Sequence, residues 1–351
     1  MAGSVDLVFE GGGVKGIGLA GAFAVLDEQG YTPHCVAGTS AGAITAALVA
    51  AGYSGSELED VVLRQMKFSQ FADPHPIDHL GVAGQGIAIL KEKGINKGDF
   101  FLGWMREMLA AKKVKTFGDL VNTDVAEGDA ARYRLQVIAS DVTERRMLVL
   151  PRDAQAHLGI APEQLEVALA VRMSMSIPIF FDPVRQPNPQ TGHEHLIVDG
   201  GLLSNFPIWL FDCPPGQTPG WPTFGLLLVA PHQADPLLAA QSEAQADDQS
   251  LSSPAAFLKA IADTAMQAHD RLYVEQANYA RTIPIPTLGV RTTEFDVPAD
   301  QAEALYQSGR DAATQFLAGW DFSAYIAEFR QGKQQSRRVD VVAKMATSPA
   351  A

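Results

Sequence analysis

The stretch VFEGGGVKGIGLAG (residues 8–21) leads from the end of an apolar segment through consecutive glycines into a run of small residues. The apolar residues before the glycines are typical of a buried strand, and a helix is expected after them. Gly11, Gly13 and Gly16 fit the spacing G-x-G-x-x-G, in which backbone N–H groups bind the pyrophosphate of a dinucleotide. The same N–H groups can instead bind a different anion, so the rest of the sequence must decide between the two.

A dinucleotide site also needs an acidic residue about 20 residues after the glycines, where it binds the ribose. No Asp or Glu occurs between Glu28 and Glu57. A phosphate-binding P-loop is excluded as well, because no Gly-Lys-Ser/Thr follows at the required spacing. The sequence therefore predicts that the glycine loop binds no nucleotide, and no cofactor is expected.

The second apolar segment ends in the motif G-x-S-x-G, with Gly38, Ser40 and Gly42 at its defined positions. In this motif the serine lies on a strained strand-to-helix turn, and the small residues around it leave its hydroxyl exposed above the sheet. Ser40 is therefore a candidate nucleophile. The N–H groups of the glycine loop would then stabilise a tetrahedral oxyanion instead of a pyrophosphate.

A serine nucleophile needs a base, and the segment HLIVDGG (residues 195–201) supplies a candidate in Asp199. Open α/β sheets form their sites at the carboxyl ends of strands, which is where this aspartate is expected. A turn or helix-capping role for Asp199 is the alternative. His232 and His269 follow it, so the chain order Ser, Asp, His of the α/β-hydrolase triad is also available. No metal site is expected, because His193 and His195, which precede Asp199, have no further ligand cluster that completes a tetrahedral set.

Composition excludes several classes of protein. The chain has 351 residues, 47% of them apolar, and a formal net charge of −13. These values fit a globular enzyme, and the absence of a basic stripe argues against a nucleic-acid partner. Two cysteines without a C-x-x-C pair favour a reducing compartment. The N-terminus lacks a signal-peptide pattern and glycines interrupt the charge-free residues 29–56, so we expect a cytoplasmic protein without a transmembrane segment.

Alternating strand and helix patterns predict an α/β fold with a mostly parallel, doubly covered sheet. We expect one domain over residues 1–330, with its motifs in about 5–230 and a helical part at about 255–320, followed by a flexible polar tail at 331–351. Strands are expected at residues 5–9, 33–38, 133–143, 195–201 and 224–230, with 145–151 pairing with the third of them. Helices are expected at residues 17–29, 42–51, 56–70, 96–112, 162–174, 255–280 and 299–318, and a mobile connection at 231–254.

Taken together, the motifs resemble the patatin-like phospholipase family. Its blocks are a G-G-G-x-[KR]-G loop, a G-x-S-x-G serine and a D-G-[GA] aspartate, in this order. Here they are GGGVKG (11–16), GTSAG (38–42) and DGG (199–201). The segment RMSMSIPIFFDPV (172–184) is similar to a fourth block of the family. The resemblance covers roughly residues 5–230, and none of the three catalytic blocks departs from the family pattern.

The resemblance implies a three-layer α/β/α fold of the FabD/lysophospholipase-like type and a Ser–Asp dyad that hydrolyses fatty acyl esters of lipids. Ser40 would attack the ester carbonyl and Asp199 would accept its proton. The oxyanion hole would consist of the N–H groups of Gly11, Gly12, Gly13 and Ala41. The remaining motif positions are Lys15, Gly16, Gly38, Gly42, Gly200 and Gly201.

The sequence thus predicts a serine acyl hydrolase that acts on phospholipids or lysophospholipids, with transient contact with a membrane surface. The alternatives are a broad carboxylesterase, an acyltransferase, or a catalytically idle lipid-binding protein on the same fold. Intact Ser40 and Asp199 argue against the last of these. The acyl length, the head group and the oligomeric state are not predicted.

Overall fold

The structure is a computed structural model that describes residues 3–66, 68–71, 94–123, 125, 130–213, 217–229, 261, 264–265, 276–292, 294 and 296–330. The expected connection at 231–254 and tail at 331–351 lie outside these residues, as does most of the helix expected at 255–280.

An eight-stranded sheet forms the centre of the molecule, in the order β10-β9-β1-β2-β4-β8-β7, with β5 paired to β4. β1, β2, β4, β9 and β10 pair in parallel, whereas β5, β7 and β8 join through antiparallel pairs. Its strands are β1 (Ser4–Phe9), β2 (Thr32–Thr39), β4 (Leu135–Asp141), β5 (Arg146–Leu150), β7 (Val184–Pro187), β8 (Glu194–Asp199), β9 (Thr223–Val229) and β10 (Thr282–Pro286). A separate small sheet pairs β3 (Gly94–Asn96) with β6 (Ile179–Phe181).

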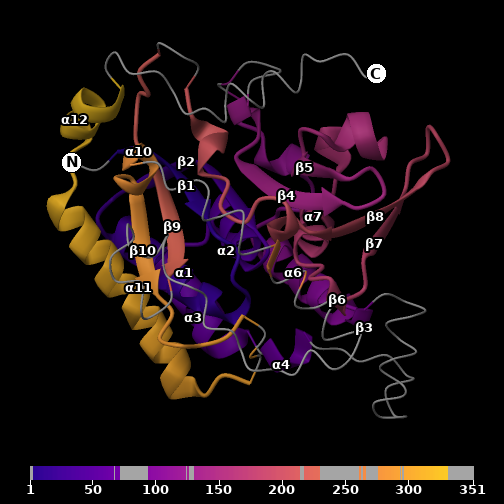
Figure 1. Cartoon of the computed structure of the whole chain (residues 1–351), viewed down its shortest axis with the longest axis horizontal. Coiled ribbons are helices and arrows are strands. Elements are labelled where there is room, and N and C mark those ends of the chain that lie inside the picture. The colour runs from indigo at the N-terminus through magenta and orange to yellow at the C-terminus, as the bar shows by residue number, and fades with distance from the viewer. Residues whose placement is uncertain are drawn as a thin grey trace.

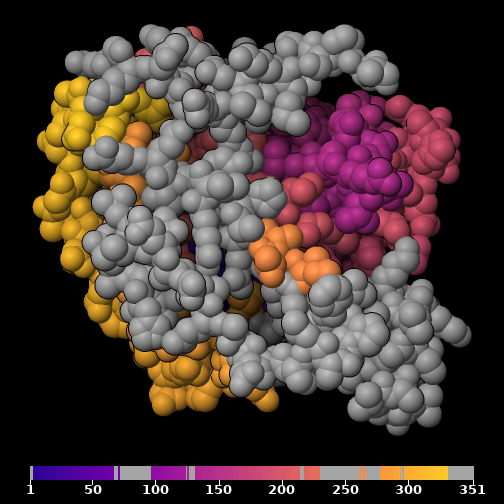
Figure 2. Space-filling view, viewed as in Figure 1, coloured from indigo at the N-terminus to yellow at the C-terminus, as the bar shows by residue number. Residues whose placement is uncertain are grey.

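Helices cover both faces of this sheet, which confirms the three-layer α/β/α fold. Figure 1 shows the sheet at the centre, with α11 along the edge formed by β10 and the β7–β8 hairpin at the opposite edge. The same two elements mark opposite edges of the surface in Figure 2. The helices are α1 (Ile17–Glu28), α2 (Ala41–Ala50), α3 (Gly55–Asp60), α4 (Phe68–Phe71), α6 (Asp99–Ala111), α7 (Val167–Ser174), α10 (Gln276–Tyr279), α11 (Ala299–Gly319) and α12 (Phe322–Tyr325).

Small residues let the first two helices pack deep in the core. Every residue of α2 is buried, and α1 is buried from Ile17 to Leu26. α1 also packs closely against α11, because a Cβ at Gly21 would lie 2.0 Å from the carbonyl oxygen of Tyr306. The helices that carry the first motifs are thus fixed by packing on both sides.

The strands expected from the sequence are present, but β3, β6, β7 and β10 were not expected, and several helices differ in their bounds. The helix expected at 162–174 starts at Val167, because Pro162–Gln164 form a separate 3₁₀ turn. The helix expected at 56–70 becomes α3 followed by the π-helix Val61–Gln65. Before α6, residues 94–96 form β3 and Gly98 adopts a left-handed conformation with φ of 76°, so the helix expected from residue 96 begins at Asp99.

No helix in the described part of the chain is both long enough and apolar enough to cross a lipid bilayer. Residues 29–56 form the turn after α1, then β2, α2, a second turn and the first two residues of α3.

Candidate active site

The glycine loop and the serine turn meet at the carboxyl ends of neighbouring strands. β1 pairs in parallel with β2, and Phe9 lies opposite Gly38, so the loop after β1 faces the turn after β2. A Cβ at Gly42 would lie 2.3 Å from the carbonyl oxygen of Phe9, which is why only glycine fits there. Likewise, a Cβ at Gly11 would lie 3.0 Å from the Cβ of Ser40. The first two motifs therefore belong to one site.

Ser40 occupies a strained turn between β2 and α2. Its φ is 54° and its ψ −128°, a backbone conformation that costs a non-glycine residue about 1–3 kcal/mol. A hydrogen bond of 2.8 Å from the Ser40 N–H to Ser174 Oγ holds the turn, and Ser174 in turn donates to the carbonyl oxygen of Ile138 at 2.6 Å. The hydroxyl of Ser40 is directed at Met175 Sδ, 3.8 Å away.

Asp199 lies at the end of β8, where it is only 1% exposed. Its Oδ1 accepts a hydrogen bond of 2.7 Å from the Gly201 N–H, whereas no hydrogen-bond partner of the buried Oδ2 occurs among the described residues. Burial raises the pKa of the Asp199 carboxyl to about 7, although the nearby Ser40 hydroxyl and the Gly201 N–H act to lower it. A buried carboxylate with one unbonded oxygen is well suited to accept a proton.

The hydroxyl of Ser40 and the carboxyl of Asp199 are neighbours without a formed hydrogen bond. The hydroxyl is close enough to lower the pKa of Asp199, yet its present contact is the sulfur of Met175. Rotation of the Ser40 hydroxyl away from Met175 toward the Asp199 carboxyl would bring the two groups into contact. Hydrogen bonds between catalytic groups are often long in unliganded enzymes and shorten when the substrate binds.

The N–H groups beside Ser40 differ in whether they are already bonded. The Gly11 N–H donates to the carbonyl oxygen of Asn205 at 3.1 Å, so this group is occupied. For the N–H groups of Gly12, Gly13 and Ala41, no acceptor occurs in the part of the chain that the structure describes. Since Ala41 begins α2, its N–H also carries the partial positive charge of the helix N-terminus. These three groups can bind an oxyanion.

Gly13 has no room for a side chain. Its φ is +57°, and a Cβ there would lie 1.9 Å from the carbonyl oxygen of Thr292. That carbonyl accepts the Val14 N–H at 3.2 Å, which fixes the loop against a segment far along the chain. The loop is therefore held in shape before any substrate arrives.

The other motif positions surround the same site. Lys15 is half-buried in the 3₁₀ turn Gly13–Gly16, next to the loop. A Cβ at Gly16 would lie 3.3 Å from the Cβ of Ala41. At Gly38 and Gly200, a Cβ would lie 2.3 and 2.2 Å from backbone oxygens, so these two glycines permit close backbone contacts. Gly201 supplies the N–H that Asp199 accepts.

Sequence reasoning did not identify two residues of the site, Asn205 and Ser174. Asn205 joins the glycine loop to the segment after β8, because its Nδ2 donates to the Gly11 carbonyl at 3.0 Å while its own carbonyl accepts the Gly11 N–H. No motif marks it. Ser174 belongs to the block at 172–184, so its segment could be found from sequence but its contact with Ser40 could not.

The histidines with known placement make no hydrogen bond to Ser40 or Asp199. His195 is buried and pairs with Asp141, Nδ1 to Oδ2 at 2.7 Å, and His193 is exposed. His34 and His157 contact other groups in the described part of the chain. His232 and His269, the candidates for a triad, lie outside the described residues.

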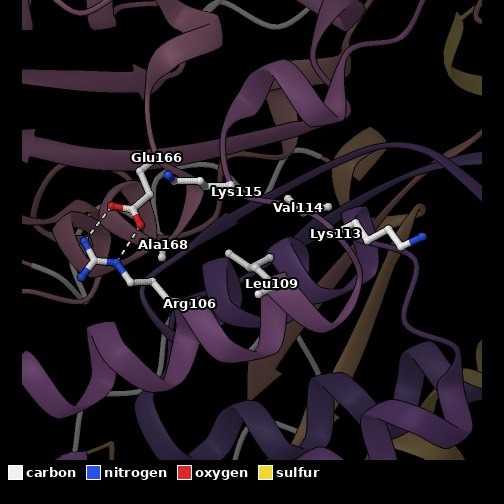
Figure 3. A pocket seen from close by; sticks show the side chains of 8 residues that line it. Arg106, Leu109, Lys113, Val114, Lys115, Glu166 and Ala168 are labelled. Atoms are coloured by element: carbon white, nitrogen blue, oxygen red, sulfur yellow. Dashed lines mark hydrogen bonds and ion pairs between the residues drawn. The ribbon is translucent and has the colours of Figure 1, made fainter.

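Two cavities lie near these elements. A narrow, mostly apolar cavity of about 20 Å³ adjoins the glycine loop and the start of α2; it is lined by Gly13, Gly16, Ile17, Ala41, Ile44, Thr45, Leu48, Leu58, Val62 and Met66. A larger one of about 660 Å³ lies between α6 and the start of α7 and is lined by neither Ser40 nor Asp199. Figure 3 shows Arg106 and Glu166 paired with each other at one side of this cavity, with ion-pair distances of 2.6 and 2.8 Å. The narrow cavity is the one that adjoins the candidate site.

Comparison with known proteins identifies relatives across most of the chain. The sequence model described as "Patatin-like phospholipase" matches residues 7–212. The uncharacterized protein YqhO of Bacillus subtilis (strain 168) is 35% identical over 322 residues, which cover 91% of this chain and 99% of YqhO.

Two solved structures are similar at lower sequence identity. VipD from Legionella pneumophila is 20% identical with a TM-score of 0.50, over 89% of this chain and 66% of VipD. A chain of the ExoU–SpcU complex from Pseudomonas aeruginosa is 18% identical with a TM-score of 0.46, over 90% of this chain and 51% of that one. This chain thus spans about two thirds of VipD and half of the second protein, and the likeness to VipD concerns the fold alone.

Proposed function

The chain belongs to the patatin-like phospholipase family, and from this premise we propose that it is a serine acyl hydrolase that cleaves fatty acyl esters of phospholipids or lysophospholipids. Ser40 is the nucleophile, and Asp199 is its general base. The observation that carries the proposal is the buried Asp199 carboxyl, which has one unbonded oxygen and lies close enough to Ser40, a serine on a strained turn, for its hydroxyl to lower the pKa of the carboxyl.

In the first step, Ser40 Oγ attacks the ester carbonyl while its proton passes to Asp199 Oδ2. The carbonyl oxygen becomes an oxyanion, which the N–H groups of Gly12, Gly13 and Ala41 stabilise. Removing one such donor typically lowers the rate by about 10²–10³. The groups are in place before reaction, since the loop and the N-terminus of α2 are fixed by packing.

The intermediate then collapses and the bond to the alcohol breaks. Asp199 returns its proton to the leaving oxygen, and the acyl group stays on Ser40 as an ester. Water attacks this ester in the second half of the reaction, and Asp199 accepts a proton from it. Release of the fatty acid regenerates the Ser40 hydroxyl and the carboxylate.

The raised pKa of Asp199 makes a carboxylate adequate for this role. An aspartate with an ordinary pKa of about 3.9 is a weak base toward a hydroxyl. Burial raises the pKa of Asp199 to about 7, so its carboxylate accepts a proton far more readily than that of an ordinary aspartate. No imidazole is then required between the carboxylate and the serine.

The narrow apolar cavity supports a fatty acyl substrate. Ile44 and Leu48 on α2 line this cavity together with Leu58 and Val62, and Gly13 and Ala41 belong to the same lining. An ester whose carbonyl oxygen binds the N–H groups would have its acyl chain directed into this apolar space. At about 20 Å³ the cavity must widen to admit a chain, and the lipid must be drawn from a membrane or micelle surface.

Replacing Ser40 by Ala tests the proposal. The purified variant should lose hydrolysis of phospholipid vesicles, followed by mass spectrometry of the released fatty acid, and should no longer react with a fluorophosphonate probe. Ser56→Ala, a change at an exposed serine in α3, is the matched control and should react like the wild type. Wild-type turnover by a folded Ser40→Ala protein would refute the serine mechanism. Fluorophosphonate labelling without release of fatty acid from any lipid would retain the nucleophile but refute the lipid substrate.

A further inference from the structure

Three side chains with metal-binding atoms come together at the end of the sheet opposite to Ser40. Asp6 lies in β1 and His34 and Cys35 lie in β2. One donor atom of each, a carboxylate oxygen, an imidazole nitrogen and a sulfur, lies within 4.8 Å of the others. Within the described part of the chain, this is the single group of three or more such residues that meets this criterion. Cys35 lies five positions before Ser40, about 16 Å away at the rise of a strand.

The distances within this group match those between ligands of one zinc ion. His34 Nδ1 lies 3.5 Å from Cys35 Sγ and 3.6 Å from Asp6 Oδ1. Tetrahedral zinc with its usual bond lengths places its nitrogen and sulfur ligands about 3.6 Å apart, and nitrogen and oxygen about 3.4 Å. The separation of 3.6 Å is too long for a direct hydrogen bond between His34 and Asp6. Nδ1 thus lies at ligand distance from both partners.

Neighbouring groups already orient the donors. Trp221 Nε1 donates to Asp6 Oδ2 at 2.8 Å, and the backbone N–H of Cys35 donates to Oδ1 at 3.0 Å, which holds Oδ1 beside His34 and Cys35. Asn122 Nδ2 approaches Cys35 Sγ at 3.6 Å, and such a contact stabilises a thiolate. The His34 ring packs on Trp221 with centroids 4.5 Å apart. Bonds of this kind around ligands are typical of metal sites, where they set orientation and affinity.

Access and charge also suit a cation. Cys35 is fully buried and Asp6 is 8% exposed, whereas the side chain of His34 is 20% exposed, so an ion can enter on the His34 side. The thiol is directed at the carbonyl oxygen of Ala131 at 3.7 Å, a weak contact that is lost when the proton leaves. Binding would release that proton to solvent and leave two negative ligands on a divalent ion.

We propose that Asp6, His34 and Cys35 bind one Zn²⁺ ion, with water as the fourth ligand. This ion would join the central strands β1 and β2 in their amino-terminal halves. A thiolate, an imidazole and a carboxylate form a ligand set that zinc accepts and that magnesium or calcium does not prefer. The role is structural, because the ion lies far from Ser40. This proposal departs from the expectation, drawn from the sequence, that the protein binds no metal.

The test uses the full chain with Cys213→Ser, which leaves Cys35 as the single thiol. Zn²⁺ is titrated against a chromogenic chelator, and Co²⁺ replaces it for absorption spectroscopy. The expected result is one equivalent of metal, a sulfur-to-cobalt charge-transfer band in the near ultraviolet, and a higher melting temperature with Zn²⁺. No stoichiometric binding, or cobalt binding without the charge-transfer band, would overturn the proposal.

Variants in the same background assign the ligands. His34→Gln changes a partly exposed side chain and should fold, yet it should weaken Zn²⁺ binding by about 100-fold or more, beyond the usual 10–100-fold effect of losing an outer contact. Cys35→Ser should abolish the cobalt band. His193→Gln, at an exposed histidine of the β7–β8 hairpin, is the matched control and should bind as tightly as its parent. Unchanged affinity in a folded His34→Gln protein would overturn the assignment. None of these readouts depends on ester hydrolysis.

Discussion

Replacing Asp199 by Asn should change the stability of the protein in a pH-dependent way. In the unfolded chain, Asp199 has an ordinary pKa of about 3.8, and in the folded protein burial raises its pKa to about 7. Between these values the folded state holds a proton that the unfolded state has lost, so the wild type loses stability as pH rises. The slope is about 1.4 kcal/mol per pH unit, and the total over the full range is about 4 kcal/mol. Asparagine does not ionise and should remove this dependence.

In the variant, burying an unbonded amide N–H costs about 1–3 kcal/mol at every pH. The informative quantity is therefore how the difference in unfolding free energy between variant and wild type changes with pH. Between pH 5 and pH 9, Asp199→Asn should gain about 3 kcal/mol relative to the wild type, with most of the gain below pH 7 and a plateau above it. At the same time, the variant should lose ester hydrolysis, since its amide cannot accept the Ser40 proton.

Urea unfolding followed by circular dichroism at a series of pH values measures this difference. Asp60→Asn is the control, because Asp60 is an exposed carboxyl whose pKa is lowered by Gln65 and Arg64. It should show no gain in stability with rising pH. A stability difference for Asp199→Asn that stays constant within about 0.5 kcal/mol from pH 5 to pH 9 would refute the argument that burial raises the pKa of this carboxyl.

Three further predictions concern catalysis. Gly12→Ala should lower kcat by about 10²–10³. The loss of stability should be small, because the added Cβ would meet only the flexible end of the Leu228 side chain. A kcat equal to that of the wild type in steady-state ester assays would contradict a role for this N–H. Val62→Ala should widen the narrow cavity and shift the preferred acyl length upward, measured as kcat/KM over a series of p-nitrophenyl esters, and an unchanged profile would show that the chain binds elsewhere. His232→Ala and His269→Ala should each retain most of kcat, and a thousandfold loss in either folded variant would replace the dyad by a triad.

One consequence of the geometry differs from what the sequence suggests. From the motif alone, Gly12→Ala and Gly13→Ala should both impair catalysis far more than stability. At Gly13, however, a Cβ would lie 1.9 Å from the backbone oxygen of Thr292, so Gly13→Ala should also destabilise the fold. Thr292 lies about 280 positions further along the chain, and no local pattern could indicate that contact.

The strands and helices were predictable where their signal is local. The continuous apolar segments that became β1, β2, β8 and β9 are typical of strands buried on both faces, and the pairing of β4 with β5 follows from their short connection. β10 was not expected, because Pro284 and Pro286 interrupt its pattern and prolines are tolerated on an edge strand such as this one. The π-helix at Val61–Gln65 was not expected either, because no pattern of apolar residues in the sequence distinguishes it from an α-helix.

By itself, the sequence determined which chemical groups the protein carries and in which order. The turn around Ser40, the glycines before it and the carboxylate at the end of β8 follow from residue type, spacing and the end of an apolar segment. Only the tertiary structure decided which N–H groups are unbonded, that Ser174 holds the Ser40 backbone and that Asp199 is buried enough to raise its pKa to about 7. It alone also joined Asp6 to His34 and Cys35. The physical reason is that spacing along a chain predicts local conformation, whereas burial and charge depend on residues that packing brings together from distant positions.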